Sequence, residues 1–369
     1  MAASSSLHAH FQEALQVHDG PTTPSGTMSP HTSGAIPFSR PASPAAVMRD
    51  QLAFVGLGQI GKWCALNLAR SLDEDGKPPL MVWNRGSEGL ELFKAHADKE
   101  DIPYVVADNL EQIAQKADIV LASLGNDKAC EEVFGELFKG WEKAKREKST
   151  IFVDMSTVGP ATADKLERTC SSVPNRHFLS APVFGPPPLA KSAGLVMAMA
   201  GQYHAKKRVS HAICPAMVRK VMDLGSDVER AAKFKLTGNA MVLGCMELLA
   251  ETMTLADQSG VGAEKLYELI QEFFPAPSFI GYGKKMLADN FKADEGFSLQ
   301  GGIKDASHIR KLGEDCSVPL PIIDIAHQHL ITARATGGGH LDWSSLVAGE
   351  RIAAGLPPFK RHLRLERYD

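Results

Sequence analysis

Three glycines between two apolar segments constrain this chain more than any other feature. Gly56, Gly58 and Gly61 have the spacing G-x-G-x-x-G and directly follow a short apolar run, LAFV. A helix-like segment and then a second apolar run follow, over residues 62–71 and 80–83. Glycine-rich turns are common alone, but strand, turn, helix and strand in this order are typical of a dinucleotide-binding unit.

Each glycine has a separate physical reason. Gly56 permits the tight turn out of the strand, Gly58 lets a pyrophosphate approach the backbone, and Gly61 lets the helix pack closely on the sheet. The helix N-terminus offers unpaired N–H groups and a partial positive charge to phosphates. The residues predicted to contact the cofactor at this turn are Gly56, Gly58, Gln59, Ile60 and Gly61.

The end of the second strand indicates which dinucleotide binds. Asn84 and Arg85 stand there, with Ser87 close by and no acidic residue before Glu88. A carboxylate at this position accepts hydrogen bonds from the ribose of NAD, whereas arginine favours the 2′-phosphate of NADP. The sequence therefore favours NADP over NAD.

Further apolar runs predict a doubly wound sheet across residues 49–224. In such sheets the carboxyl ends of the strands line the cofactor crevice. Ser123 and Leu124 follow one predicted strand, and Ser156 and Thr157 follow the next, so all four are candidate site residues. The segment HFLSAPVFGPPPLAKSAGL predicts a short strand and a loop too rich in glycine and proline to be helical.

The character of the chain changes at about residue 225, and residues 225–347 predict an all-helical second domain. Its first helix, over residues 228–260, contains no proline and is mostly apolar. Lys235 and Asn239 are four residues apart, so they share one face of this helix. Polar groups in so apolar a helix need partners or line a cavity.

The two ends of the chain differ from its middle. Residues 1–48 are rich in Ser, Pro, Thr and Ala, which predicts a disordered arm, and residues 348–369 predict a basic, exposed tail. The arm is too poor in arginine for a mitochondrial transit peptide and lacks a secretory core, which favours a cytoplasmic protein. The formal net charge of the whole chain, −3, gives no bias toward nucleic acid or anionic membrane. No apolar run in the chain has the length of a membrane span. The six cysteines are scattered and no histidine pattern indicates a metal site, so we expect reduced thiols and no metal.

With these motifs, the chain resembles the β-hydroxyacid dehydrogenases, which include 3-hydroxyisobutyrate dehydrogenase and glyoxylate/succinic semialdehyde reductases. The resemblance spans roughly residues 50–345. It depends on FVGLGQIG with VWNR, DMSTVGP, APVFGPPPLAKSAGL, KLTGNAMVLG with ETMTLADQSG, and the shorter IKDASHI, in the order of the family.

The resemblance implies an oxidoreductase with a role for several residues. Lys235 matches the family's general acid/base, and Asn239 matches the asparagine that helps to hold the substrate. Thr157 matches a residue near the nicotinamide, and Lys304 matches a lysine that reaches into the cleft beside the cofactor. Lys233 is a local rival to Lys235, but only Lys235 is followed by asparagine four residues later.

One motif departs from the family. Phe184 stands where members commonly have a serine that binds the substrate carboxylate, and three prolines, residues 186–188, follow Gly185. The predicted substrate pocket comprises Ser156, Phe184, Gly185, Lys235 and Asn239. A larger or less acidic carbonyl compound is therefore the expected substrate, unless Phe184 turns away and backbone amides replace the serine.

Two rival functions stay open. Imine reductases share the fold and the Asn-Arg strand end, but they usually carry Asp or Tyr at the position of Lys235. Some relatives lack the lysine and bind the cofactor without catalysis. The resemblance also implies a dimer or tetramer formed through the helical domain.

Overall fold

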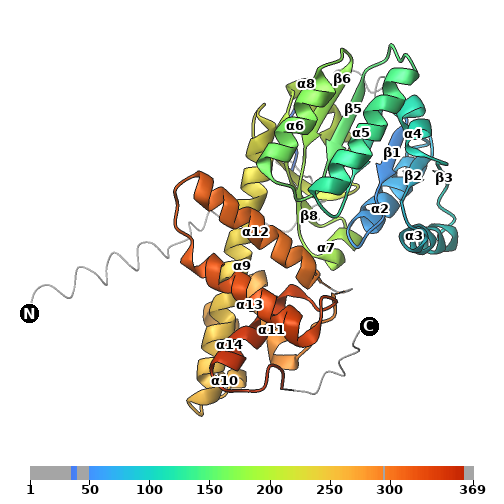
Figure 1. The fold of residues 1–369 in the computed structure, drawn as a ribbon. Coiled ribbons are helices and arrows are strands. Elements are labelled where there is room, and N and C mark those ends of the chain that lie inside the picture. The colour runs from blue at the N-terminus through green and yellow to red at the C-terminus, as the bar shows by residue number, and fades with distance from the viewer. Residues whose placement is uncertain (1–34, 40–49, 294–295, 361–369) are drawn as a thin grey trace, which may run out of the picture. The chain divides into compact units, whose positions relative to one another are not determined.

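The computed structural model describes residues 35–39, 50–293 and 296–360 (Figure 1). Most of the predicted N-terminal arm lies outside the described residues. Residues 35–39 do not: the Phe38 side chain is buried in the core, and the backbone N–H of Val221 donates to the Ala35 carbonyl at 2.8 Å. At this point the chain packs against the sheet, so the prediction of disorder is wrong for these five residues.

The first domain is built on one mixed sheet with the strand order β3-β2-β1-β4-β5-β6-β8-β7, and β9 also pairs with β8. Strands β1 to β6 run parallel, and β8 joins β6 in the antiparallel direction. The bounds of the strands are β1 Leu52–Val55, β2 Leu80–Trp83, β3 Tyr104–Val106, β4 Ile119–Ala122, β5 Thr150–Asp154, β6 Arg176–Ser180, β7 Val183–Phe184, β8 Leu195–Gly201 and β9 Val218–Asp223.

Helices cover both faces of this sheet, because alternate residues of each buried strand point to opposite faces. In β1, Leu52 and Phe54 belong to one apolar core, and Ala53 and Val55 belong to the other. The predicted doubly wound Rossmann domain is confirmed. Its helices are α2 Gly61–Glu74, α3 Ser87–Lys99, α4 Leu110–Lys116, α5 Asp127–Lys143, α6 Pro160–Ser171, α7 Pro187–Lys191 and α8 Tyr203–Ile213.

The long helix α9 leads from the sheet into an all-helical domain (Figure 1). Asp227 caps its N-terminus by accepting from the Glu229 N–H at 3.0 Å. Helix α9 contacts α6 and β8 of the first domain and α10 to α14 of the second, whose core is a third apolar cluster. The elements are α9 Val228–Gln258, α10 Ala263–Phe273, α11 Pro277–Ala288, α12 Leu299–Asp315, α13 Pro321–Gly337, η3 Trp343–Leu346 and α14 Val347–Ala353.

Two sequence predictions need correction. The proline-rich loop contains the one-turn helix α7, with proline in its first turn. Proline is tolerated there because the first N–H groups of a helix have no partner within it. The helical domain also continues past residue 347: α14 follows, and Phe359 is buried in the helical core. Only residues 361–369 of the predicted tail lie outside the described residues.

Candidate active site

The glycine turn is tight against the neighbouring strand ends. Gly56 has φ +89°, and a Cβ built on it would lie 2.2 Å from the Ser123 carbonyl oxygen. A Cβ on Gly61 would lie 2.0 Å from the Gly56 carbonyl oxygen, so both positions require glycine for reasons internal to the fold. A Cβ on Gly58 would have no neighbour within 4 Å. Gly58 therefore faces open space in front of the turn.

The N-terminus of α2 has the features of a phosphate site. Among the described residues, no N-cap side chain accepts from this 14-residue helix, and the Lys62 N–H donates to the Gly58 carbonyl at 3.1 Å. The first N–H groups of the helix and the glycine turn form the concave, positively polarised surface that binds a pyrophosphate in related folds. Ser123 and Leu124 lie beside it, since both contact the space around Gly56.

The two residues at the end of β2 differ in what their side chains do. The Asn84 amide is used by the backbone: its Oδ1 accepts from the Leu57 N–H at 2.9 Å, and its Nδ2 donates to the Gly86 carbonyl at 2.8 Å. The Asn84 side chain thus links the turn after β1 to the turn after β2. The Arg85 side chain is exposed, and its Nη2 lies 2.9 Å from Oε2 of Glu132.

Glu132 was not identified from the sequence. It lies on α5, 47 residues after Arg85, and Lys128 Nζ lies 3.9 Å from its other oxygen. The strand end therefore has a carboxylate between two cations, although no acidic residue follows β2 directly. Nothing local in the sequence signals this approach, because it depends on how α5 packs.

The candidate catalytic cluster joins the two domains through a chain of polar contacts. Lys235 Nζ donates to Asn239 Oδ1 at 3.0 Å, and Asn239 Nδ2 donates to Asp305 Oδ2 at 2.7 Å. Lys304 Nζ lies 3.1 Å from Asp305 Oδ1 and donates to the Thr157 carbonyl oxygen at 2.5 Å. The four predicted residues Lys235, Asn239, Lys304 and Thr157 therefore meet at one place, linked by Asp305.

Asp305 is the organising carboxylate of this cluster, and it is almost completely buried. Asp305 follows Lys304 in the motif IKDASHI, and the resemblance implied no role for it. An acidic residue next to a candidate cleft lysine was the available signal.

The environment of Lys235 suits proton transfer near neutral pH. Burial, opposed by Asp305 and assisted by nearby Lys304, lowers the pKa of its ammonium group to about 8. The rival Lys233 instead pairs with Glu229 at 2.5 Å, and this hydrogen bond raises its pKa. The two lysines thus differ in their pKa shifts, and Lys235 is the one whose pKa is lowered.

Ser156 lies between the glycine turn and this cluster. Its Oγ accepts from the Leu124 N–H at 2.8 Å, and its own N–H donates to Asp154 Oδ1 at 2.9 Å. Asp154 is buried at the end of β5, and burial raises its pKa to about 6. The Ser156 side chain therefore braces the strand ends, and it is itself buried.

Phe184 covers the amine of Lys235. The Lys235 Nζ lies 4.4 Å from the centroid of the Phe184 ring, and the ring of Phe234 meets the same ring edge-to-face at 5.7 Å. A Cβ on Gly238 would lie 2.4 Å from Phe184 Cε1. The Phe184 ring thus turns toward α9 and not away from it, and Gly185, at φ +134°, turns the chain after it.

A second polar contact holds α12 against the first domain. His308 Nε2 lies 2.8 Å from Asp127 Oδ2, and Asp127 Oδ1 accepts from the Gly159 N–H and the Thr162 hydroxyl. Hydrogen bonds from His308, Gly159 and Thr162 together hold the pKa of Asp127 well below its usual range, against the effect of its burial. Lys304 and His308 are one helical turn apart, so both fix the same stretch of α12 beside the site.

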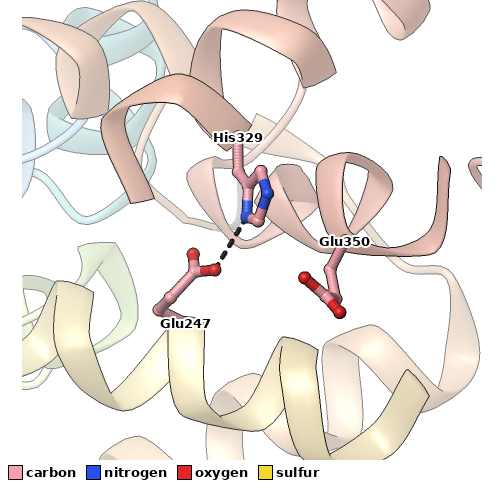
Figure 2. Close-up of side chains that lie close together, drawn as sticks. All are labelled: Glu247, His329 and Glu350. Carbon is pink, nitrogen blue, oxygen red and sulfur yellow. Dashed lines mark hydrogen bonds and ion pairs between the residues drawn. The ribbon is translucent and has the colours of Figure 1, made fainter. Parts of the chain in front are cut away.

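Figure 2 shows a separate cluster within the helical domain, formed by Glu247, His329 and Glu350. Each offers one potential metal-ligand atom, and these atoms lie within 4.8 Å of one another. His329 Nδ1 already lies 2.7 Å from Glu247 Oε1, and this hydrogen bond raises the pKa of His329. We interpret the cluster as an ion pair between α9 and α13, with room for the imidazole provided by Gly349.

Two family models match successive parts of the chain. Residues 51–225 match the NAD binding domain of 6-phosphogluconate dehydrogenase. Residues 230–349 match a second family model, described as the NAD-binding domain of NADP-dependent 3-hydroxyisobutyrate dehydrogenase. The chain belongs to the β-hydroxyacid dehydrogenase family. The predicted resemblance is therefore confirmed, and with it an oxidoreductase-family protein with a nicotinamide-cofactor-binding domain.

Individual relatives agree over most of their length. The uncharacterized oxidoreductase YfjR of Bacillus subtilis is 27% identical over 80% of this chain and 98% of its own. The NADH-dependent oxidoreductase ucdB of Aspergillus ustus is 27% identical over 76% of this chain and 92% of its own. The structure of a 3-hydroxyisobutyrate dehydrogenase from Salmonella typhimurium covers 81% of this chain and 99% of its own, with a TM-score of 0.69 and 18% identity, and so supports the fold. None of the described helices has the length and apolarity to cross a membrane.

Proposed function

We propose that this protein is an NADP-dependent oxidoreductase that interconverts a carbonyl compound and the corresponding alcohol. The single observation that carries this proposal is the Lys235–Asn239–Asp305–Lys304 cluster, held beside the carboxyl ends of the parallel strands. In doubly wound sheets this edge is where the cofactor lies.

The residues present fit a nicotinamide dinucleotide. The uncapped N-terminus of α2 suits the pyrophosphate, and Gly58 leaves room for it. Arg85 and Lys128 suit a 2′-phosphate, which favours NADP, but Glu132 between them opposes it. The name of one relative specifies NADH, and the preference for NADP proposed here depends on Arg85 and Lys128.

The chemistry assigned to the chain is proton transfer. The bound cofactor supplies or accepts the hydride at the carbonyl carbon. Lys235 in its ammonium form donates a hydrogen bond to the carbonyl oxygen and then a proton to the developing alkoxide. Asn239 orients the amine, and Asp305 orients Asn239, so the acid is held in place before the reaction. Thr157 and Lys304 stand between this acid and the strand ends.

Turnover of NADPH with a panel of aldehydes, keto acids and cyclic imines tests the proposal. Lys235→Ala should reduce kcat by about 100-fold or more while NADPH still binds, because general acid catalysis contributes about 10²–10⁴-fold. Lys233→Ala is the matched control: it removes a lysine two residues away that pairs with Glu229, and turnover should be unchanged. Equal loss in both variants would contradict the role of Lys235.

The same experiment separates the rival functions. Turnover of cyclic imines but not of aldehydes would favour an imine reductase, and binding of NADPH without any turnover would favour a non-catalytic module. Lys235 argues against an imine reductase, because those enzymes usually carry Asp or Tyr at this position. Lys235, Asn239 and Lys304 argue against a module that only binds the cofactor, because such a module has no need for a lysine of lowered pKa.

Helix α9 also supports a homo-oligomer. Three exposed apolar side chains lie along it at intervals of seven residues: Met241, Leu248 and Leu255. Met241 is 76% exposed and Leu255 is 66% exposed. A repeat of seven keeps these residues on one face, as in helices that pack along each other. A second copy of α9 is the proposed partner, and sedimentation of the purified protein should give the mass of a dimer or a larger assembly.

A further inference from the structure

We infer that this site takes a neutral carbonyl compound with a bulky apolar substituent, and that Phe184 and Phe234 bind this substituent. The inference rests on the proposed function and adds its substrate class. It is carried by the position of two aromatic rings beside the candidate acid, described above.

The first step is the position of the rings relative to Lys235. The Phe184 ring lies against the ammonium group of Lys235. Phe234 precedes Lys235 on α9, and its side chain is partly exposed to solvent. A carbonyl group that accepts a proton from Lys235 must therefore have its substituents next to aromatic carbon. Burying apolar surface there contributes about 25 cal/mol per Å².

The second step is the use of the polar groups around Lys235. Asn239 Nδ2 donates to Asp305, and Lys304 is bound to Asp305 and to the Thr157 carbonyl. Lys235 spends one donor on Asn239 Oδ1 and retains others for a single carbonyl oxygen. A substrate carboxylate held against the two rings, away from the ammonium group of Lys235, would lose hydration without gaining hydrogen bonds from the rings, which is costly.

The third step is that the fold makes room for the Phe184 ring. Gly238 lies under the ring, and a Cβ there would lie 2.4 Å from Cε1 and 2.8 Å from Cζ. Glycine within a helix is less favourable than alanine, and here the space of the missing side chain is filled by the ring of Phe184. Phe184 and Gly238 thus act as a pair that sets the apolar wall of the site.

The test compares two aldehydes of the same length and shape. Succinic semialdehyde carries a carboxylate where 4-methylpentanal carries an isopropyl group, and 3-phenylpropanal extends the apolar series. With NADPH, the wild-type protein should have a kcat/KM for 4-methylpentanal at least about tenfold above that for succinic semialdehyde, because its isopropyl group is buried against the two rings. Phe184→Ser should remove most of this preference, whereas Phe184→Leu should retain it.

A second pair of variants tests the ring position itself. Gly238→Ala should weaken turnover of 4-methylpentanal because the new methyl group displaces the Phe184 ring. In the Phe184→Ser background the same change should have little effect, because no ring remains to displace. Equal effects of Gly238→Ala in both backgrounds would contradict the pairing of Phe184 and Gly238.

Ligand-observed NMR on the NADP-loaded protein gives a readout that does not require turnover. 4-Methylpentanol should bind and 4-hydroxybutyrate should not, and Phe184→Ser should weaken the binding of 4-methylpentanol. Preference for 4-hydroxybutyrate, or turnover of succinic semialdehyde equal to that of 4-methylpentanal, would overturn the inference and leave the oxidoreductase proposal intact. Failure of the wild-type protein to bind NADPH would instead refute the proposed function.

Discussion

The two ends of the candidate active site are built in different ways. The cofactor end uses a strand, a glycine turn and a helix that are consecutive in the chain, with steric reasons for Gly56 and Gly61 that lie within the fold. The substrate end gathers Thr157, Phe184, Lys235 and Asp305 from four distant segments. The first end is therefore constrained by backbone geometry, and the second depends on how two domains pack.

The largest expected effect comes from breaking the cofactor end at Gly61. Gly61→Ala places a Cβ 2.0 Å from the Gly56 carbonyl oxygen, a backbone atom that cannot rotate away. Overpacking of this kind costs about 1–3 kcal/mol, so we expect a lower melting temperature and loss of NADPH binding.

Gly58→Ala is the matched control for Gly61→Ala. A Cβ on Gly58 meets no described protein atom within 4 Å, so the stability of the free protein should be unchanged. Its methyl group would instead obstruct the approaching pyrophosphate, so NADPH should bind more weakly. If both variants lose stability equally, the assignment of Gly58 to the ligand is wrong. Thermal unfolding with and without NADPH measures both effects.

At the substrate end, the expected effect is a pH dependence of the reaction. Reduction needs Lys235 in its charged form, and burial lowers the pKa of this group to about 8. The kcat/KM for reduction should therefore be constant below about pH 8 and fall about tenfold per pH unit above it. Alcohol oxidation by the proposed mechanism needs the neutral amine, so its kcat/KM should rise about tenfold per pH unit up to about pH 8 and stay constant above it.

The dissociation constant of NADPH should stay constant between pH 7 and 9 if the two ends are independent. A fall in NADPH affinity that parallels the fall in kcat/KM would show that Lys235 acts on cofactor binding. The cofactor end and the substrate end of the site would then not be independent. A titration of protein fluorescence at each pH measures this constant.

This contrast explains how much the sequence could predict. The turn, both strands around it and the helical domain follow from glycine spacing and apolar periodicity, and the structure confirms them. Lys235 and Asn239 could be paired because four residues make one helical turn, and their side chains are hydrogen-bonded. Helix α7 was missed because proline was interpreted only as a helix breaker, although it is favourable in a first turn.

Contacts between distant segments could not be predicted. Glu132 approaches Arg85 from α5, and Gly238 makes room for Phe184 across the domain boundary. Neither residue stands near its partner in the sequence. Glu132 belongs to no motif, and the motif KLTGNAMVLG that contains Gly238 does not indicate a contact with Phe184. Phe359 is similar: a basic tail gave no sign that one aromatic residue returns to the helical core.

The smallest expected effect sharpens the comparison at the cofactor end. Glu132 Oε2 accepts a hydrogen bond from Arg85 Nη2 at 2.9 Å, so a 2′-phosphate must compete with this carboxylate for the arginine. Glu132→Gln removes the negative charge but keeps the shape of the side chain. NADPH should then bind about two- to fivefold more tightly, equivalent to about 0.4–1 kcal/mol, while NADH affinity should not increase. The expected gain is modest because Arg85 is exposed, and exposed ion pairs contribute about 0–1 kcal/mol.

Glu131→Gln controls for the change in net charge. Glu131 precedes Glu132 on α5 but pairs with Lys165 at 2.6 Å, away from Arg85, so the ratio of NADPH to NADH affinity should stay that of the wild type. Titration of both cofactors against the three proteins at two salt concentrations separates the direct effect from general electrostatics, which salt screens. An unchanged ratio in Glu132→Gln would mean that the contact between Arg85 and Glu132 has no part in cofactor choice. The strand end would then select its cofactor from the residues of β2 alone, as the local sequence predicts.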